Sequence, residues 1–129
     1  MIGYIATINL PPSLKDLHNI DQIEIFLEDF IPPNLKMKNG DCISTLKFPV
    51  NISESNIQYL KDWYELNWNN EIEYKSCIIG NITVDKFLTD NGHLLERMTL
   101  YNVRPFDSRD FDILFKEKSI DFLVDYLII

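Results

Sequence analysis

The chain has 129 residues, the usual size of one folded domain, and 46% of them are hydrophobic. Twenty acidic residues against twelve lysines and arginines give a net charge of −8 with scattered bases, which argues against a phosphate-binding surface. The hydrophobic content argues against a disordered chain. The chain neither opens like a signal peptide nor contains the ~20 apolar residues of a membrane span. We therefore expect a single domain made in a reducing cytoplasm, without membrane binding.

The start of the chain predicts two strands separated by a loop. Every second residue from Ile2 to Leu10 is apolar or aromatic, which predicts a strand over Met1–Leu10. Residues 13–21 fit either a short helix, with Ser13 as its cap, or an irregular loop, and we favour the loop. Over Gln22–Phe30 branched apolar residues recur at period two, which predicts a second strand.

Two turns and a two-faced strand follow. The Pro32-Pro33 pair and the Lys38–Asp41 cluster contain the residues that turns favour. From Cys42 to Ile52 apolar and polar residues alternate, which predicts a strand with one buried face. Its core-facing residues are predicted to be Leu46, Phe48, Val50 and Ile52. Pro49 cannot donate a backbone hydrogen bond to a neighbouring strand. We therefore expect this strand to lie at a sheet edge, or its hydrogen bonding to be disrupted at Pro49.

One amphipathic helix is predicted over residues 55–67. It begins at Ser53 or Ser55, and Ser55 with Gln58 has the spacing of a capping box, in which two side chains satisfy free backbone donors. Apolar residues recur at helical spacing on one side, which favours packing against a core over stacking on nucleic-acid bases. The packed residues are predicted to be Ile57, Leu60, Trp63, Tyr64 and Trp68.

A second group of strands follows the helix. Alternation predicts a strand from Ile72 to Val84 with a break at Gly80-Asn81. The sequence Asp90-Asn91-Gly92 predicts a hairpin turn, since Asn and Gly tolerate positive φ. The strand that returns from this turn is predicted to run to Val103.

The end of the chain predicts two further strands. A short one includes Phe111, Ile113 and Phe115, and a turn over Lys116–Ser119 follows it. The last strand is predicted over Ile120–Ile129. Its buried face is predicted to contain Ile120, Phe122, Val124, Tyr126 and Ile128.

Together these elements predict an α+β, mainly β fold. We expect two packed antiparallel sheets, as a sandwich or barrel, flanked by the one helix. Residues 1–129 are predicted to form one domain, with N-terminal strands and loops over 1–45 and a strand-helix-hairpin-strand core over 46–129.

The sequence contains no pattern that predicts catalysis, a cofactor or a metal site. His18 and His93 are far apart, and Cys42 and Cys77 lack the close spacing of zinc ligands. We interpret the two cysteines as small buried thiols. If Gly92 is aligned with the glycine of an EF-hand calcium loop, apolar residues fall at the ligand positions, which excludes an EF-hand here. We therefore predict that the protein is not an enzyme.

Several segments occur in an informative order. They are Leu46–Val50, a helix over Ile57–Tyr64 that contains Asp62-Trp63, then Glu73–Ser76, Met98–Pro105 and Ile120–Tyr126. In this order the chain from Leu46 onward resembles the tail tube proteins of contractile-tailed bacteriophages. Before Leu46 the chain is shorter than the pattern of that family, which leaves two roles open: the main tube subunit, or a tube initiator close to the baseplate.

The resemblance implies a structural protein of the virion tail, assembled in the host cytoplasm. Copies would form hexameric rings that stack into a tube, a conduit for DNA ejection, and would contact neighbouring tube, sheath or baseplate proteins. DNA would be passing cargo only. Acidic side chains would then line the lumen and repel DNA, and the candidates are Glu96, Asp110 and Asp112.

The negative charge leaves a different interpretation open. Excess carboxylates either serve solubility alone or meet a basic partner. The alternative function is therefore a small acidic phage-encoded binding protein that inhibits a basic host protein. An enzyme, in contrast, would require a pocket with convergent polar groups.

Overall fold

The computed structural model describes residues 1–33, 42–68, 79–106 and 116–129. Within these residues the elements are β1 (Ile2–Asn9), α1 (Pro12–His18), β2 (Gln22–Leu27), β3 (Asp29–Ile31), β4 (Cys42–Lys47), α2 (Glu54–Trp68), β5 (Gly80–Leu88), β6 (Leu94–Pro105), β7 (Ser119–Val124) and β8 (Tyr126–Ile128). The predicted turn at Lys38–Asp41, the start of the strand from Ile72 and the strand through Phe111–Phe115 lie outside the described residues.

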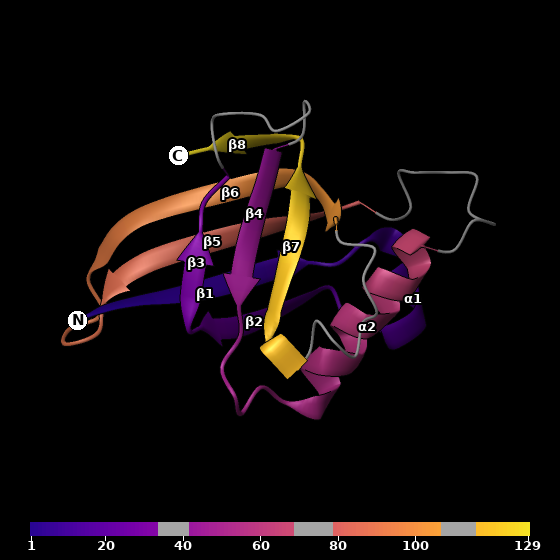
Figure 1. Cartoon of the computed structure of the whole chain (residues 1–129), viewed down its shortest axis with the longest axis horizontal. Coiled ribbons are helices and arrows are strands. Elements are labelled where there is room, and N and C mark those ends of the chain that lie inside the picture. Colours follow the sequence, from indigo (N-terminus) through magenta and orange to yellow (C-terminus); the bar gives the residue numbers. More distant parts are fainter. Residues whose placement is uncertain (34–41, 69–78, 107–115) are drawn as a thin grey trace.

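All eight described strands belong to one antiparallel sheet. Its strand order is β2-β1-β5-β6-β7-β4-β3. The eighth strand, β8, is not part of this order and pairs with β6. The first part of β6 pairs with β5 and β8, whereas Arg104 and Pro105 at its end pair with β7. We call β2, β1, β5, β8 and the first part of β6 the first limb, and the end of β6 with β7, β4 and β3 the second limb. Figure 1 shows the second limb crossing steeply over the first.

The sheet is not closed, because its end strands β2 and β3 do not pair with each other. They are consecutive in the chain, however, and only Glu28 separates them. The backbone N–H of Glu28 donates to the carbonyl oxygen of Lys47 at 2.8 Å. The mainly β, antiparallel fold is confirmed, while the structure has one bent sheet where two packed sheets were predicted.

A single core lies between the two limbs. It includes Ala6 and Ile8 of β1, Ile82 of β5, Leu46 of β4 and Phe122 of β7, all with 0% exposure. The period-two alternation of these strands places every second side chain on the inner face of the sheet. Burial of this apolar surface is the main source of stability.

The helix α2 packs its apolar face on this core. Leu60, Trp63 and Tyr64 are buried there, and Ile57 is partly buried against it. The predicted helix is therefore confirmed, although the side chain of Trp68 lies outside the described residues.

Of the two serines predicted to begin α2, Ser53 is the one that caps it. The Ser53 Oγ accepts the backbone N–H of Asn56 at 3.2 Å, and the Ser53 carbonyl accepts that of Ile57. Ser53 is thus the N-cap. The predicted capping box of Ser55 and Gln58 is wrong, because the amide of Gln58 donates along the helix to Asp62 at 2.8 Å.

A second helix, α1, forms where the sequence was interpreted as a loop. It packs Leu14, which is 2% exposed, into the core. The carbonyl of Pro11 accepts the N–H groups of Leu14 and Lys15, so Pro11 and not Ser13 is the N-cap. Asn19 ends the helix in the left-handed conformation, at φ 52°. One buried leucine was too weak a periodic signal to predict a helix of this length.

The strand predicted from Cys42 to Ile52 ends early, at Lys47. Pro49 lies two residues farther on, and Val50 is 82% exposed instead of buried. Because β4 pairs with both β3 and β7, it is not an edge strand. The ladder instead stops before the proline, which has no N–H to continue it.

The final predicted strand is divided into β7 and β8 at Asp125. The N–H of Asp125 donates to the carbonyl of Tyr101 at 3.1 Å, and its carboxylate accepts from the Asn102 side chain. This bend transfers the chain from the second limb to β6. Tyr126 and Ile128 are therefore 49% and 55% exposed, although the alternation predicted them to be buried.

The predicted break at Gly80-Asn81 lies at the start of β5, and the part of the predicted strand before Ile79 lies outside the described residues. The pairing between β5 and β6 is irregular between Gly80 and Ile82. Opposite this point Asn102 has φ 53°, and its N–H donates to the Asn81 side chain at 3.2 Å. Such an irregularity bends a sheet locally, here close to the crossing of the two limbs.

Candidate functional site

Three described strands, β2, β3 and β8, each have an edge that no other described strand pairs. Large apolar side chains are exposed on all three: Phe26 of β2 at 65%, Ile31 of β3 at 56%, and Tyr126 and Ile128 of β8. Tyr126 is stacked on Tyr101 of β6, with ring centroids 4.8 Å apart. Unpaired edges with apolar side chains are templates for pairing with another chain. They are the first candidate functional surface.

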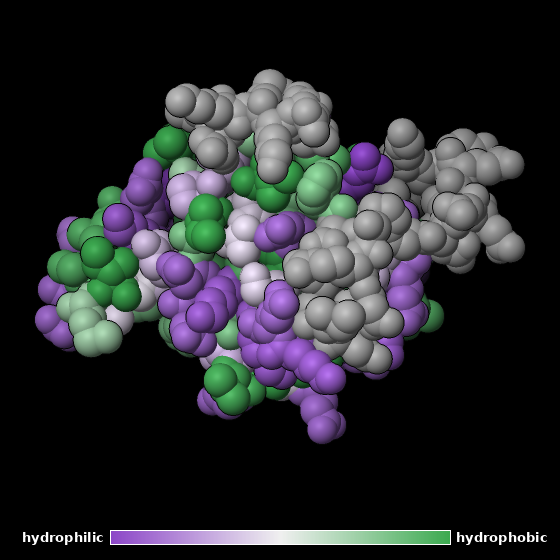
Figure 2. Space-filling model, in the orientation of Figure 1, coloured by the Kyte–Doolittle hydropathy of each residue, from purple (hydrophilic) through white to green (hydrophobic). Residues whose placement is uncertain are grey.

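A second apolar surface lies at the hairpin end, where the N-terminus meets the β5–β6 turn. The turn itself is at the predicted Asp90-Asn91-Gly92, with Gly92 at φ 71°. Thr89 donates its N–H to the carbonyl of Met1 at 3.0 Å, which joins the N-terminus to the hairpin. Figure 2 shows apolar side chains gathered at this end, on the left of the view. They are Met1, Ile2, Leu94 and Leu95.

The outward face of the first limb combines aromatic and charged groups. The ring of Phe87 lies over Gly3, where an added Cβ would approach it to 2.7 Å. Phe26 contacts Phe87 edge to face, with centroids 6.3 Å apart. Farther along, Arg97 donates to both carboxylate oxygens of Asp85, at 2.7 and 3.0 Å. This hydrogen bonding and the charge of Asp85 raise the pKa of Arg97.

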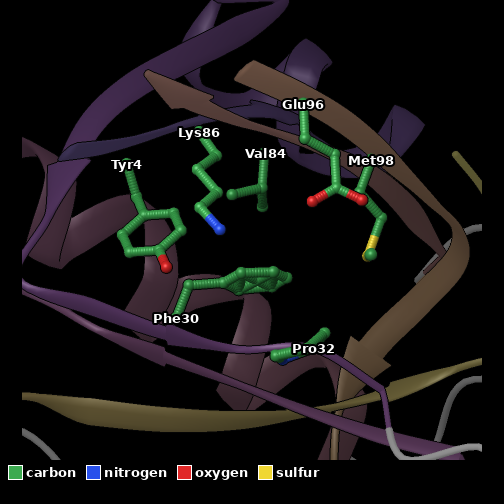
Figure 3. A pocket seen from close by; sticks show the side chains of 7 residues that line it. All are labelled: Tyr4, Phe30, Pro32, Val84, Lys86, Glu96 and Met98. Carbon is green, nitrogen blue, oxygen red and sulfur yellow. The ribbon is translucent and has the colours of Figure 1, made fainter. Parts of the chain in front are cut away.

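A small cavity opens between the limbs. Its volume is about 100 Å³, and it is lined by Tyr4, Phe30, Pro32, Val84, Lys86, Glu96 and Met98. Figure 3 shows side chains of β1, β5 and β6 pointing toward Phe30 and Pro32 across it. Tyr4 and Phe30 are in edge contact at 6.0 Å. Ligand pockets usually measure about 300–1,000 Å³, so this cavity is smaller than a typical ligand pocket.

The acidic residues predicted to face a lumen are only partly described. Glu96 is exposed, lies opposite Lys86 in the β5–β6 register and lines the cavity. Asp110 and Asp112 lie outside the described residues. Of the three predicted acids, the structure therefore describes the position of Glu96 alone.

The interaction of α1 with α2 was not predicted from the sequence. The Nε2 of His18 lies 2.6 Å from a carboxylate oxygen of Asp62, and both side chains are less than one fifth exposed, at 18% and 19%. The His18 ring also contacts Tyr59, with centroids 4.8 Å apart. Asp62 additionally accepts the hydrogen bond from Gln58. These contacts attach α1 to α2; an open hollow of about 230 Å³ lies beside them.

The described residues contain no group of three or more His, Cys, Asp or Glu placed to hold a metal ion. His93 lies at the exposed hairpin, and its carbonyl accepts the N–H of Leu88 at 2.9 Å. Cys42 is half-buried, and desolvation raises the pKa of its thiol. Cys77 lies outside the described residues.

The chain was compared with known proteins at three levels. No protein-family model matches it, and neither the curated proteins nor the solved structures contain a significant match. Of the described helices, none is long and apolar enough to cross a membrane.

Proposed function

We propose that the chain is a structural subunit that assembles with copies of itself into rings, as part of a contractile phage tail tube or of the initiator close to its baseplate. Rings would be hexameric and would stack into a conduit for DNA ejection. The contacts that this function requires lie on exposed strand edges and at the hairpin end.

The order of elements supports this proposal. Of the segments that resemble tail tube proteins, the first begins at the end of β4, and the others lie in α2, in β6, and in β7 with the start of β8. The segment Glu73–Ser76 lies outside the described residues. In this proposal the two limbs of the bent sheet serve as the two layers of the tube subunit, and α2 flanks them. The hairpin end, with its exposed Met1, Ile2, Leu94 and Leu95, would contact the next ring.

The observation that carries the proposal is the apolar character of two unpaired edges. Ile31 on β3 and Ile128 on β8 are both more than half exposed, and neither edge is covered by a described strand. Burying such a side chain contributes about 1.5–3 kcal/mol. In a closed ring each edge can pair with the edge of a neighbour, so that the exposed backbone groups of both are satisfied.

The experiment is to measure assembly of the purified full chain by light scattering and electron microscopy. We expect rings or tubes for the natural sequence. Ile31→Lys and Ile128→Lys should each raise the concentration needed for half-maximal assembly about tenfold or more, because a charge replaces an apolar contact. Val50→Lys is the matched control: Val50 is equally apolar and 82% exposed, but follows the end of β4 instead of lying on an edge.

A chain that stays monomeric in solution and is missing from intact phage particles would contradict the proposal. The same outcome, together with a salt-sensitive complex with a basic protein, would favour the acidic binding protein instead. The observation favouring that second function is the exposure of Asp21, Glu24, Glu28 and Asp29 along and beside β2.

A further inference from the structure

We propose that the unpaired edge of β2 is a docking site for a β-strand of a different, basic protein chain. The partner strand would alternate lysine or arginine with apolar residues. This inference does not rest on ring formation, since the ring contacts were assigned to β3, β8 and the hairpin end.

The backbone of β2 is suited to accept another strand. It pairs with β1 in regular register over six consecutive residue pairs, from Tyr4↔Leu27 to Asn9↔Gln22, and no described strand covers its other edge. Exposed edges are usually protected by lysine, proline or a bulge. The segment Gln22–Leu27 contains no lysine or proline, and the ladder to β1 contains no bulge. Added strands bind such edges through main-chain hydrogen bonds.

The side chains of β2 specify what the added strand should contain. Ile23, Ile25 and Leu27 point into the core and are at most 7% exposed, whereas Gln22, Glu24 and Phe26 point outward and are exposed. Cross-strand neighbours on the same face interact directly. A partner strand therefore needs apolar residues on the core side. On the outward side it needs a lysine or arginine beside Glu24 and a side chain that contacts the ring of Phe26.

Phe26 provides an apolar anchor within this polar row. Its side chain is 65% exposed and is held edge to face against Phe87. An exposed aromatic ring in a fixed orientation loses little conformational entropy on binding. It also attracts a lysine or arginine placed over its face.

Charge selects a foreign strand over a second copy of this chain. Pairing two copies of β2 would bring Glu24, and the acidic residues Asp21 and Glu28 that flank the strand, close to the same carboxylates of the second copy, which is unfavourable. The other unpaired described edges, Asp29–Ile31 and Tyr126–Ile128, contain no basic residue. Within the chain itself, a lysine already lies next to an acidic residue just after the end of β2: the Lys47 ammonium is 3.5 Å from the Glu28 carboxylate.

The test uses the isotopically labelled full chain and the synthetic peptide Lys-Val-Lys-Val-Lys-Val-Lys, followed by NMR. We expect saturable shifts in the amides of β2, with affinity that falls as salt is added. Glu24→Lys should weaken binding about fivefold or more, because attraction across the strands becomes repulsion. Glu65→Lys makes the same charge change at an exposed position of α2 and should leave the Kd within about twofold of the natural value, since a distant surface charge contributes little.

A second peptide separates strand addition from simple charge attraction. N-methylation of alternate valines removes backbone donors but leaves every lysine in place, and we expect this peptide to lose binding. Equal binding of both peptides, or shifts confined to β3, β8 or α2, would overturn the inference. Ring formation is measured without peptide and through Ile31 and Ile128, so either idea can fail independently of the other.

Discussion

Gly80 occupies the point where β1, β5 and α2 come closest. A Cβ atom at this position would lie 2.5 Å from the carbonyl oxygen of Asn9 and 3.2 Å from the ring of Trp63. Trp63 is fully buried and contacts Phe122, with centroids 5.3 Å apart. Neither the backbone of β1 nor this ring has room to move, so the absence of a side chain allows α2 to pack closely on the sheet.

Gly80→Ala should therefore destabilise the protein by about 1–3 kcal/mol, as overpacking of a core does. The measurement is urea unfolding. Gly3→Ala is the matched control: the three atoms nearest to its Cβ would all belong to the side chains of Phe87 and Thr89, which lie outside the core and not in the backbone of a neighbouring strand. Equal losses of stability in the two variants would contradict the packing role of Gly80.

At the scale of elements, the start of α2 depends on one serine side chain. Ser53 and Ser55 are both plausible caps in the sequence, but only the Ser53 Oγ accepts a hydrogen bond from the first turn, from Asn56. The chain reaches this point after the Pro49 turn, in which the N–H of Ile52 donates to the carbonyl of Pro49 at 3.1 Å. The path of the preceding turn thus decides which serine begins the helix.

Ser53→Ala should cost about 1 kcal/mol of unfolding free energy, since it removes the acceptor for a backbone N–H of the first turn. Ser55→Ala, which lies inside the first turn, should change stability by less than about 0.5 kcal/mol. Thermal unfolding of the two single variants decides between them. A larger loss of stability for Ser55→Ala than for Ser53→Ala would support the capping box that was predicted from the sequence.

At the scale of the whole molecule, the bend of the sheet joins all strands into one cooperative unit. The two limbs share one core, and the chain crosses from one end of the sheet to the other through Glu28 alone. Residues of either limb therefore lose their packing when the other limb opens. We expect a single unfolding transition.

Phe122→Ala tests whether the two limbs unfold together, because Phe122 lies on the second limb and contacts Trp63 of α2. The substitution should cost about 3–5 kcal/mol, the usual loss for truncating a buried phenylalanine. Circular dichroism, which follows the sheet, and tryptophan fluorescence should shift to the same lower midpoint. Two separated midpoints would indicate limbs that unfold independently.

Part of the candidate functional surface could be predicted from the sequence. Alternation in β2, β4 and β7 indicates two-faced strands, and the charge of −8 indicates an acidic exterior. Which strands lie at the edges could not be predicted, because pairing joins segments far apart in the chain. The internal place of β4 and the exposure of Tyr126 and Ile128 follow from such pairing. The contact of His18 with Asp62 likewise depends on α1 packing against α2.

The sequence by itself determined the mainly β class, the amphipathic helix and the hairpin turn, because each depends on neighbours within a few residues. Only the tertiary structure decided the single bent sheet, the division of the last strand at Asp125 and which of the described strands have an unpaired edge. Those features depend on which strands meet and on how the backbone bends to enclose a common core, and local periodicity contains neither kind of information.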